Sequence, residues 1–425
     1  MAREVKELQS GYISSNLQDI LNTYKSINQS FIPNANRIHQ VAIKGDLLTE
    51  MYLKADTLSR PEARKYNKDF AVSVNYLEKI VDAKTKIYTF DVTRTVANAT
   101  EQALLDKLVA GAGLNTHMGN ANQYFNASKS VLVELYLNRY GVLSVRPIPN
   151  SNFFVYSDDF IEPNLPTAYI KIIKSAKNSD GKTVDILHIY TDTEFMIVTT
   201  DSKVQRYIEN IWGVAPFTYI NKEAYELYPT LDMDSLQNVI NINAIETNAV
   251  VCTFYQGHPV RWIKNFDKKK SSIDINPDAI LILNGVEGSD RTPEIGEMGS
   301  SLDPGKATAL ATHLLNNVLF KHDINPKDAV QTGSSGIALQ LKDINMLENR
   351  KAQIEIFTPA EQELLYKMCI MHNVMVQEKL GGAKTPVGTF NINKDFAIEV
   401  EYQLPDAAAE VQNEDAPADD SAGVS

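Results

Sequence analysis

The residues of this sequence that could bind a phosphate or a cofactor stand in incomplete motifs. Gly181-Lys182-Thr183 matches the end of a P-loop, in which backbone N–H groups surround a phosphate and the lysine reaches it, but Ala176 occupies the position of the first glycine. The pair Gly111 and Gly113 lacks the third glycine of a dinucleotide fingerprint, and the end of a helix accounts for it. We therefore predict no bound cofactor.

The candidate nucleophiles and metal ligands are equally isolated. The segment 333–336, Gly-Ser-Ser-Gly, is not the Gly-x-Ser-x-Gly elbow of a hydrolase, and no strand precedes it. His313 and His322 share one predicted helix without an acidic residue at ligand spacing. Cys252 and Cys369 lie in apolar helical stretches, where buried free thiols are usual, and cannot form a zinc site alone. The sequence predicts no catalytic or metal-binding residue and no enzyme.

The charge balance bears on nucleic-acid binding. The 425 residues include 41 Lys and Arg against 53 Asp and Glu, a net charge of −12. Tight non-specific DNA binding needs clustered lysine and arginine that release counterions, so this balance argues against a protein that grips DNA. A conduit through which DNA slides has the opposite requirement, but many other soluble proteins are acidic too.

The N-terminus and the hydropathy pattern bear on location. Residues 1–7 have no apolar core of a signal peptide, and no apolar run approaches the length of a membrane span. We therefore expect synthesis in a cytoplasm and no membrane partner.

The stretch from Leu231 to Leu347 reads as helix, small β-rich insert, helix, Gly/Ser loop and helix. The first helix, Asp232 to Phe254, has apolar residues at a spacing of three and four. The second begins at Asp303-Pro304, an N-cap followed by proline, and Pro326 closes it. The insert contains two strand-like runs, at 258–263 and 279–283.

The flanking regions read as helices, an antiparallel strand meander and a long helix. We expect helices from Ala63 to Val81, from Glu101 to Ala110 and from Ala121 to Asn138. Thr358-Pro359 in the last helix predicts a kink or a break, because proline removes a hydrogen bond and clashes with the preceding turn. A final strand covers 396–402. The strands of the expected meander are 142–146, 152–156, 168–173, 184–190, 195–199 and 204–208.

This order of elements resembles the portal proteins of tailed bacteriophages, in particular the compact portals related to those of siphophages. Short strings at 76–88, 140–149 and 213–217 and Leu404-Pro405-Asp406 after the last strand add to the resemblance. It implies an α+β portal fold with a helical and β wing, a two-helix stem, a small β-containing clip and a long kinked wing helix, in a subunit that forms rings.

The resemblance also implies domain boundaries. We expect an N-terminal arm and wing at 1–230, stem helices at 231–256 and 300–324, a clip at 257–299, a tunnel loop at 325–336, a long kinked helix with the last wing strand at 337–404, and an acidic disordered tail at 405–425. Many family members carry a helical crown after the last strand, and we expect none in this sequence.

The function implied is a ring of about twelve subunits at one capsid vertex, through which double-stranded DNA passes during packaging and ejection without sequence-specific contacts. The implied partners are further copies of the chain, the terminase large subunit, adaptor or connector proteins, and the major capsid and scaffolding proteins. The chain would be made in the cytoplasm of a host bacterium and reside in the virion. Two alternatives stay open: another virion ring or adaptor protein, and a cytoplasmic enzyme with an unrecognised site.

The resemblance further assigns candidate site residues. The tunnel loop would contact DNA through Lys327, Gln331, Thr332, Ser334 and Ser335. Lysines near the two ends of the second stem helix, Lys306 and Lys321, would form bands that meet phosphates. The clip would dock partners through Arg261, Trp262, Lys268, Lys269 and Lys270. Each assignment has an alternative. The segment 325–336 could be an ordinary surface loop, Lys306 and Lys321 could lie on solvated helix faces, and Lys268, Lys269 and Lys270 could form the tip of a hairpin.

Overall fold

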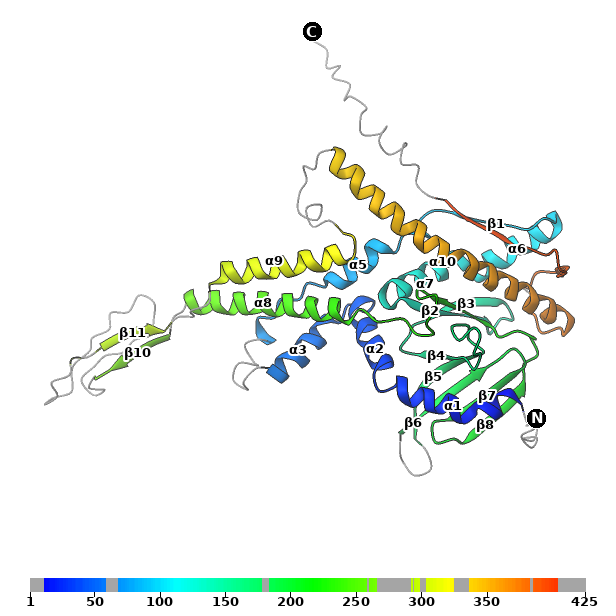
Figure 1. Cartoon of the computed structure of the whole chain (residues 1–425), viewed down its shortest axis with the longest axis horizontal. Helices are drawn as coiled ribbons and strands as arrows, with labels where there is room; N and C mark the ends of the chain where they lie inside the picture. The colour runs from blue at the N-terminus through cyan, green and yellow to red at the C-terminus, as the bar shows by residue number, and fades with distance from the viewer. Residues whose placement is uncertain are drawn as a thin grey trace, which may run out of the picture. The chain divides into compact units, whose positions relative to one another are not determined.

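The computed structural model (Figure 1) describes residues 11–58, 68–177, 183–257, 260–265, 292, 294–298, 303–324, 336–382 and 385–403. The chain divides into two compact units. Unit 1 comprises Met1–Asp46, Asn75–Leu236 and Leu319–Ser425, and unit 2 comprises Leu47–Val74 and Gln237–Val318. Unit 2 is therefore formed by two excursions of the chain out of unit 1.

Unit 1 contains a five-stranded antiparallel sheet with the order β4-β5-β6-β7-β8. Side chains alternate between its faces, and α1 (Tyr12–Ile27) covers one of them, so that Ile20 and Leu21 pack with Ile170 and Leu187. Consecutive strands pair from β4 to β8, which confirms five of the six strands of the predicted meander. The first predicted strand, 142–146, lies instead in a second sheet, where it pairs with the strand before it. The strands are β4 (Phe153–Tyr156), β5 (Ala168–Lys177), β6 (Thr183–Tyr190), β7 (Glu194–Thr199) and β8 (Val204–Glu209).

A three-stranded sheet with the order β3-β2-β9 forms the second β element of unit 1. It packs with helices into a second core that includes Val133, Val145, Leu105 and Phe125. The strands are β2 (Ser130–Leu137), β3 (Leu143–Ile148) and β9 (Phe217–Asn221), and the helices that contribute to this core include α6 (Ala99–Ala112) and α7 (Leu114–Ser128). Two further helices, α2 (Phe31–Ala42) and α5 (Tyr76–Lys84), pack against α7.

Two helices were predicted too long. The helix expected from Ala121 to Asn138 starts earlier, at Leu114, and stops at Ser128, because Lys129 adopts a left-handed conformation with φ 61° and the apolar run after it, which includes Val131 and Val133, enters β2. The helix expected from Ala63 to Val81 is also interrupted. Residues 71–75 are not helical, and α5 starts afresh where the side chain of Asn75 accepts a hydrogen bond from the backbone N–H of Glu78.

The long helix α10 (Gly336–Gln377) runs through Pro359 without interruption, so of the kink or break expected at Thr358 the break is not found, and the kink stays a prediction. Phe357 before the proline and Leu364 after it are both buried in the same core, which holds the two halves together. The hydroxyl of Thr358 donates to the carbonyl oxygen of Ile354 (2.8 Å). The predicted last strand appears as β12 (Glu399–Tyr402), which pairs with β1 (Val92–Thr95).

Unit 2 contains α3 (Leu47–Leu58) and most of two long helices, α8 (Met233–Gly257) and α9 (Pro304–Lys321), both close to the predicted bounds (Figure 1). The strand predicted at 258–263 is β10 (Val260–Lys264). Its partner is β11 (Glu294–Met298), which the sequence analysis missed, and the predicted strand at 279–283 lies outside the described residues. Residues 72–74 run along α8. The backbone N–H of Val72 donates to the Thr247 hydroxyl (2.9 Å), and that of Val74 donates to the side-chain oxygen of Asn243 (2.6 Å).

Candidate functional site

The structure describes four of the residues predicted from the resemblance. Lys306 and Lys321 lie at opposite ends of α9, as expected, and are not brought together. Arg261 and Trp262 lie on β10, opposite Glu297 and Gly296 of β11. The other predicted residues lie outside the described part of the chain; they are Lys268, Lys269, Lys270, Lys327, Gln331, Thr332, Ser334 and Ser335.

A polar cluster joins the start of α8 to the end of α9, and we call it the clasp: Asp232, Ser235, Lys321 and His322. Asp232 caps α8, because its carboxylate accepts hydrogen bonds from the backbone N–H of Ser235 (3.2 Å) and from the Ser235 hydroxyl (2.7 Å). The same carboxylate lies 2.6 Å from Nζ of Lys321 and 3.2 Å from Nε2 of His322. One aspartate therefore fixes both helix ends.

The clasp depends on Asp232 being ionised. Burial acts to raise the pKa of Asp232, but hydrogen bonds from His322, Lys321 and Ser235 outweigh it and hold this pKa well below its ordinary value. Burial acts to lower the pKa of Lys321, and the bond to Asp232 outweighs it, so that this pKa is raised. Both partners stay charged at neutral pH.

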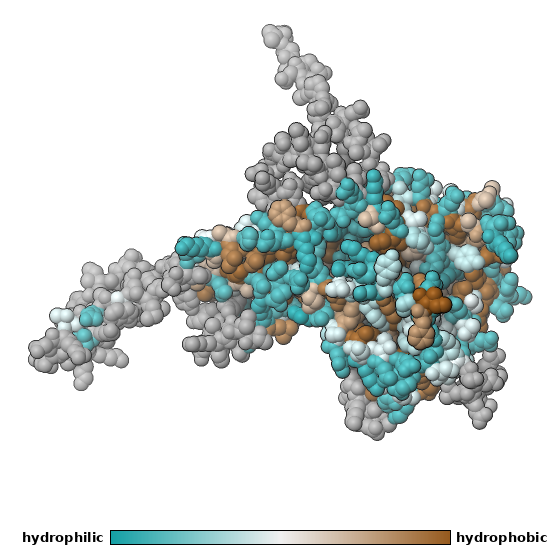
Figure 2. Space-filling model, in the orientation of Figure 1, coloured by the Kyte–Doolittle hydropathy of each residue, from teal (hydrophilic) through white to brown (hydrophobic). Residues whose placement is uncertain are grey.

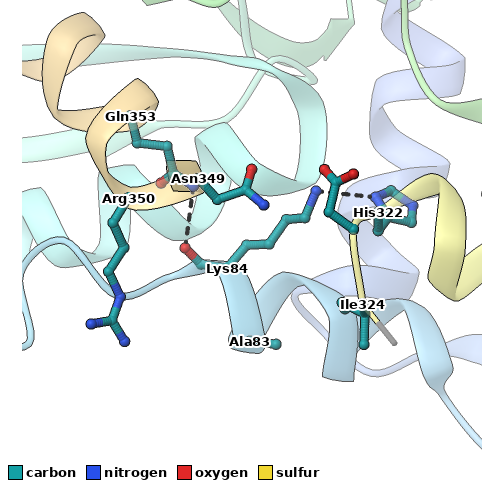
Figure 3. A pocket seen from close by; sticks show the side chains of 8 residues that line it. Ala83, Lys84, His322, Ile324, Asn349, Arg350 and Gln353 are labelled. Carbon is teal, nitrogen blue, oxygen red and sulfur yellow. Dashed lines mark hydrogen bonds between the residues drawn. The ribbon is translucent and has the colours of Figure 1, made fainter. Parts of the chain in front are cut away.

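Lys84, the last residue of α5, extends the cluster (Figure 3). Its Nζ atom lies 3.5 Å from Nδ1 of His322, and its backbone carbonyl accepts a hydrogen bond from the Gln353 side chain of α10 (3.3 Å). Burial lowers the pKa of Lys84, although Asp323 and Asp232 partly offset this. His322 therefore stands between the clasp and a partly buried lysine.

Two small cavities adjoin these residues. One, of about 30 Å³, is lined by Lys84, His322, Asp323 and Gln353 among others and has room for roughly one water molecule (Figure 3). The other, of about 120 Å³, is lined by Lys84, His322 and Asp232 and by residues of α7 and α10. Both are smaller than the cavities of about 300–1,000 Å³ that usually hold drug-sized ligands.

The serine, histidine and aspartate of the clasp do not form a hydrolytic triad. In a triad the aspartate binds one imidazole nitrogen while the other faces the serine. Here Ser235 and Asp232 both contact Nε2 of His322, Nδ1 faces Lys84, and the Ser235 hydroxyl already donates to Asp232. This geometry positions helix ends and does not generate a nucleophile.

The sequence analysis singled out three of the four clasp residues, but it did not predict that they meet. Asp232 was predicted as a helix start, Lys321 as a channel lysine, and His322 was weighed only as a metal ligand. The Asp-x-x-Ser spacing from Asp232 to Ser235 was the one available signal of a capping residue. Among the residues described, no three His, Cys, Asp or Glu side chains gather as a metal site would require. No described helix has the length and apolar character to cross a membrane.

Comparisons with known proteins show what the chain resembles. Residues 11–387 match the family described as phage portal protein, SPP1 Gp6-like. No curated protein sequence matches the chain. A solved chain from the neck of an empty GTA particle is 12% identical, with a TM-score of 0.41 and coverage of 79% of this chain and 83% of that one. A chain from the virion of a native gene transfer agent particle is 11% identical, with a TM-score of 0.39 and coverages of 86% and 92%.

Proposed function

Because this chain belongs to the SPP1 Gp6-like family of phage portal proteins, we propose that it forms a ring of about twelve subunits at one vertex of a capsid and that DNA passes through the ring. The observation that carries the proposal is the family match, which extends from residue 11 to residue 387. The family supports a portal or connector role in the virion, and its members are structural rather than catalytic. In this proposal the chain makes and breaks no covalent bond.

The helices α8 and α9 are the proposed stem. The clasp joins them at one end, where Lys321 and His322 meet Asp232, and at their other ends the chain continues into β10 and β11, within the proposed clip at 257–299. The proposed tunnel loop, 325–336, follows the clasp directly in the chain, so the clasp would anchor its first residues.

Lys306 is the better candidate of the two α9 lysines for transient contact with DNA phosphates. The Lys321 ammonium is already engaged by Asp232. Lys306 is exposed, and no described carboxylate forms an ion pair with it. A band of Lys306 side chains in an acidic protein, with a net charge of −12, would touch the passing duplex without holding it. Lys327 of the tunnel loop would act in the same way.

The remaining partners follow from the same proposal. The terminase large subunit and the adaptor or connector proteins would dock on the clip, with Arg261, Trp262 and the lysines 268–270 as contacts. Major capsid and scaffolding proteins would surround the wing, which comprises residues 1–230 and the last strand.

The experiment that tests the proposal is negative-stain electron microscopy of the purified full chain, with mass photometry of the same sample. We expect rings with a central hole and a mass near that of twelve subunits of 47.4 kDa. A defined small oligomer without a hole would contradict the proposal. A second measurement uses particles assembled with the cognate capsid, scaffolding and terminase proteins. DNase-protected DNA should appear only when this chain is present.

A further inference from the structure

The connection between β4 and β5 exposes large apolar side chains. Phe160 is 100% exposed, Ile161 90% and Leu165 51%, and Tyr225, on the turn after β9, is 91% exposed. The side-chain amide of Asn164 donates to the carbonyl oxygen of Ala224 (2.9 Å), which brings the two segments together. Figure 2 shows apolar side chains on the surface of unit 1 in this region. We call Phe160, Ile161, Leu165 and Tyr225 the acidic-rimmed patch.

Hydrogen bonds within the connection hold this patch in place. The carboxylate of Asp159 accepts the backbone N–H groups of Ile161 (2.7 Å) and Glu162 (3.2 Å), and the N–H of Leu165 donates to the carbonyl oxygen of Glu162 (3.0 Å). Such turns present Phe160 and Ile161 in one conformation, which lowers the entropy lost when a partner covers them.

The rim of this patch is negative. The segments 157–167 and 221–228 contain Asp158, Asp159, Glu162, Glu223 and Glu226 against the single cation Lys222. Exposed aromatic and branched side chains with a charged rim are typical of protein interfaces. The negative charge of this rim indicates a partner surface of positive charge. A partner with an apolar centre and basic neighbours would match it.

Unit 1 carries a second patch of that kind. Tyr140 is 61% exposed, Leu380 40% and Val387 97%. Two hydrogen bonds join these segments, since the carbonyl oxygen of Gly141 accepts from the backbone N–H of Gly382 (3.2 Å) and from the Thr385 hydroxyl (2.9 Å). We call Tyr140, Leu380 and Val387 the basic-rimmed patch, because the exposed charged residues described beside them in the chain are Arg139, Lys379 and one carboxylate, Glu378.

We propose that the acidic-rimmed patch of one subunit docks on the basic-rimmed patch of a second copy of this chain. The two patches differ in residues and in charge, so the contact is heterologous, and heterologous contacts generate rings when the rotation closes. The inference rests on the proposed function, from which it takes the ring. It adds which surfaces meet.

Two blocked variants test the pairing. Phe160→Asp with Ile161→Asp removes the first patch, and Tyr140→Asp with Val387→Asp removes the second. All four side chains are exposed, so circular dichroism and thermal unfolding should match the wild type. Mass photometry should find neither variant in rings under conditions where the wild type assembles. Ile211→Asp, at an exposed apolar residue outside both patches, is the matched control and should assemble normally.

Mixing the two blocked variants gives the sharper result. Each retains the patch that the other lacks, so the mixture should form a species of two subunits and nothing larger. A charge exchange, Glu162→Lys and Glu226→Lys combined with Arg139→Glu and Lys379→Glu, should restore assembly that either half abolishes, and it leaves the Asp159 turn intact. Rings from either blocked variant, or no dimer in the mixture, would overturn the inference and leave the proposed function standing. A wild-type chain that never self-associates would overturn the proposed function itself.

Discussion

The Nζ atom of Lys321 lies 2.6 Å from Oδ1 of Asp232, so the last residue of α9 is bonded to the residue that precedes α8. These two residues are 89 positions apart in the chain and bracket the whole excursion that contains both helices, β10 and β11. His322 adds a second contact to the same carboxylate at 3.2 Å. The excursion therefore leaves and re-enters unit 1 at one bonded point.

Replacing Asp232 by alanine should weaken this point. The change removes an N-cap, which costs about 0.5–2 kcal/mol, and leaves Lys321 and His322 without their shared acceptor. Because the Lys321 side chain is 45% exposed, its ion pair adds little, and we expect a total loss of about 1–3 kcal/mol in urea unfolding. Asp234→Ala is the matched control. Its side chain is 89% exposed and 3.7 Å from Lys321, so a loss as large as that of Asp232→Ala would contradict the clasp.

Acid should open the clasp. The pKa of Asp232 is lowered in the folded chain, whereas in the unfolded chain the carboxyl takes up its proton near the ordinary value of 3.8. Its stabilising contribution is therefore complete above that value and is lost as the pH falls toward the folded pKa. Asp232→Asn keeps a capping oxygen without a charge. Below about pH 4 the melting temperature of the wild type should fall more steeply than that of Asp232→Asn, and parallel curves would contradict the assignment.

The sequence predicted the elements whose signals are local. The β4–β8 meander has alternating side chains and turn residues between strands, and all five strands were found close to their predicted bounds. The ends of α8 and α9 carry caps and prolines, and both helices were found as expected. The buried positions Leu236, Val239 and Ile242 follow the predicted spacing.

The errors arose where tertiary contacts decide. Val131, Leu132 and Leu135 fit a helix spacing, but all three are buried, because the side chains of β2 enter one core on one face and another core on the other. A fully buried strand has no alternation to detect. Pro359 does not break α10, because the core holds the helix on both sides. Residues 294–298 carry no sequence signal of a strand, and they form β11 by pairing with β10. The predicted tunnel loop and most clip residues stay predictions.

A buried ion pair should be the most sensitive polar site of unit 1. Oε1 of Glu361 accepts a hydrogen bond from Nε of Arg94 (2.6 Å), and its other oxygen accepts from the hydroxyls of Tyr88 (2.5 Å) and Tyr402 (2.6 Å). Burial, and then the charge of Glu361, raise the pKa of both tyrosines, which therefore remain donors at neutral pH. The network ties α10 to β1 and β12.

Glu361→Gln should destabilise the chain by about 3–5 kcal/mol in chemical denaturation, because it leaves the Arg94 charge buried without its partner. Glu363→Gln, at a side chain that is 44% exposed and paired with Lys367 one helical turn away, should change stability by less than about 0.5 kcal/mol. Equal losses of unfolding free energy from the two substitutions would contradict the prediction that the buried pair contributes more to stability than the exposed one.

The approach of Gly382 to Tyr140 leaves no room for a side chain. A Cβ atom at Gly382 would lie 1.9 Å from the carbonyl oxygen of Tyr140, so Gly382→Ala must push two backbone segments apart. We expect a loss of about 1–3 kcal/mol in thermal unfolding and faster amide exchange near Gly141, whose carbonyl accepts the Gly382 N–H. Gly111→Ala is the control. Its Cβ would meet only Val142 at 3.9 Å, and within α6 the change should stabilise by about 0.5–1 kcal/mol. Because this junction also joins the two segments that carry Tyr140 and Val387, Gly382→Ala should impair assembly. Unchanged unfolding and exchange would contradict the close approach.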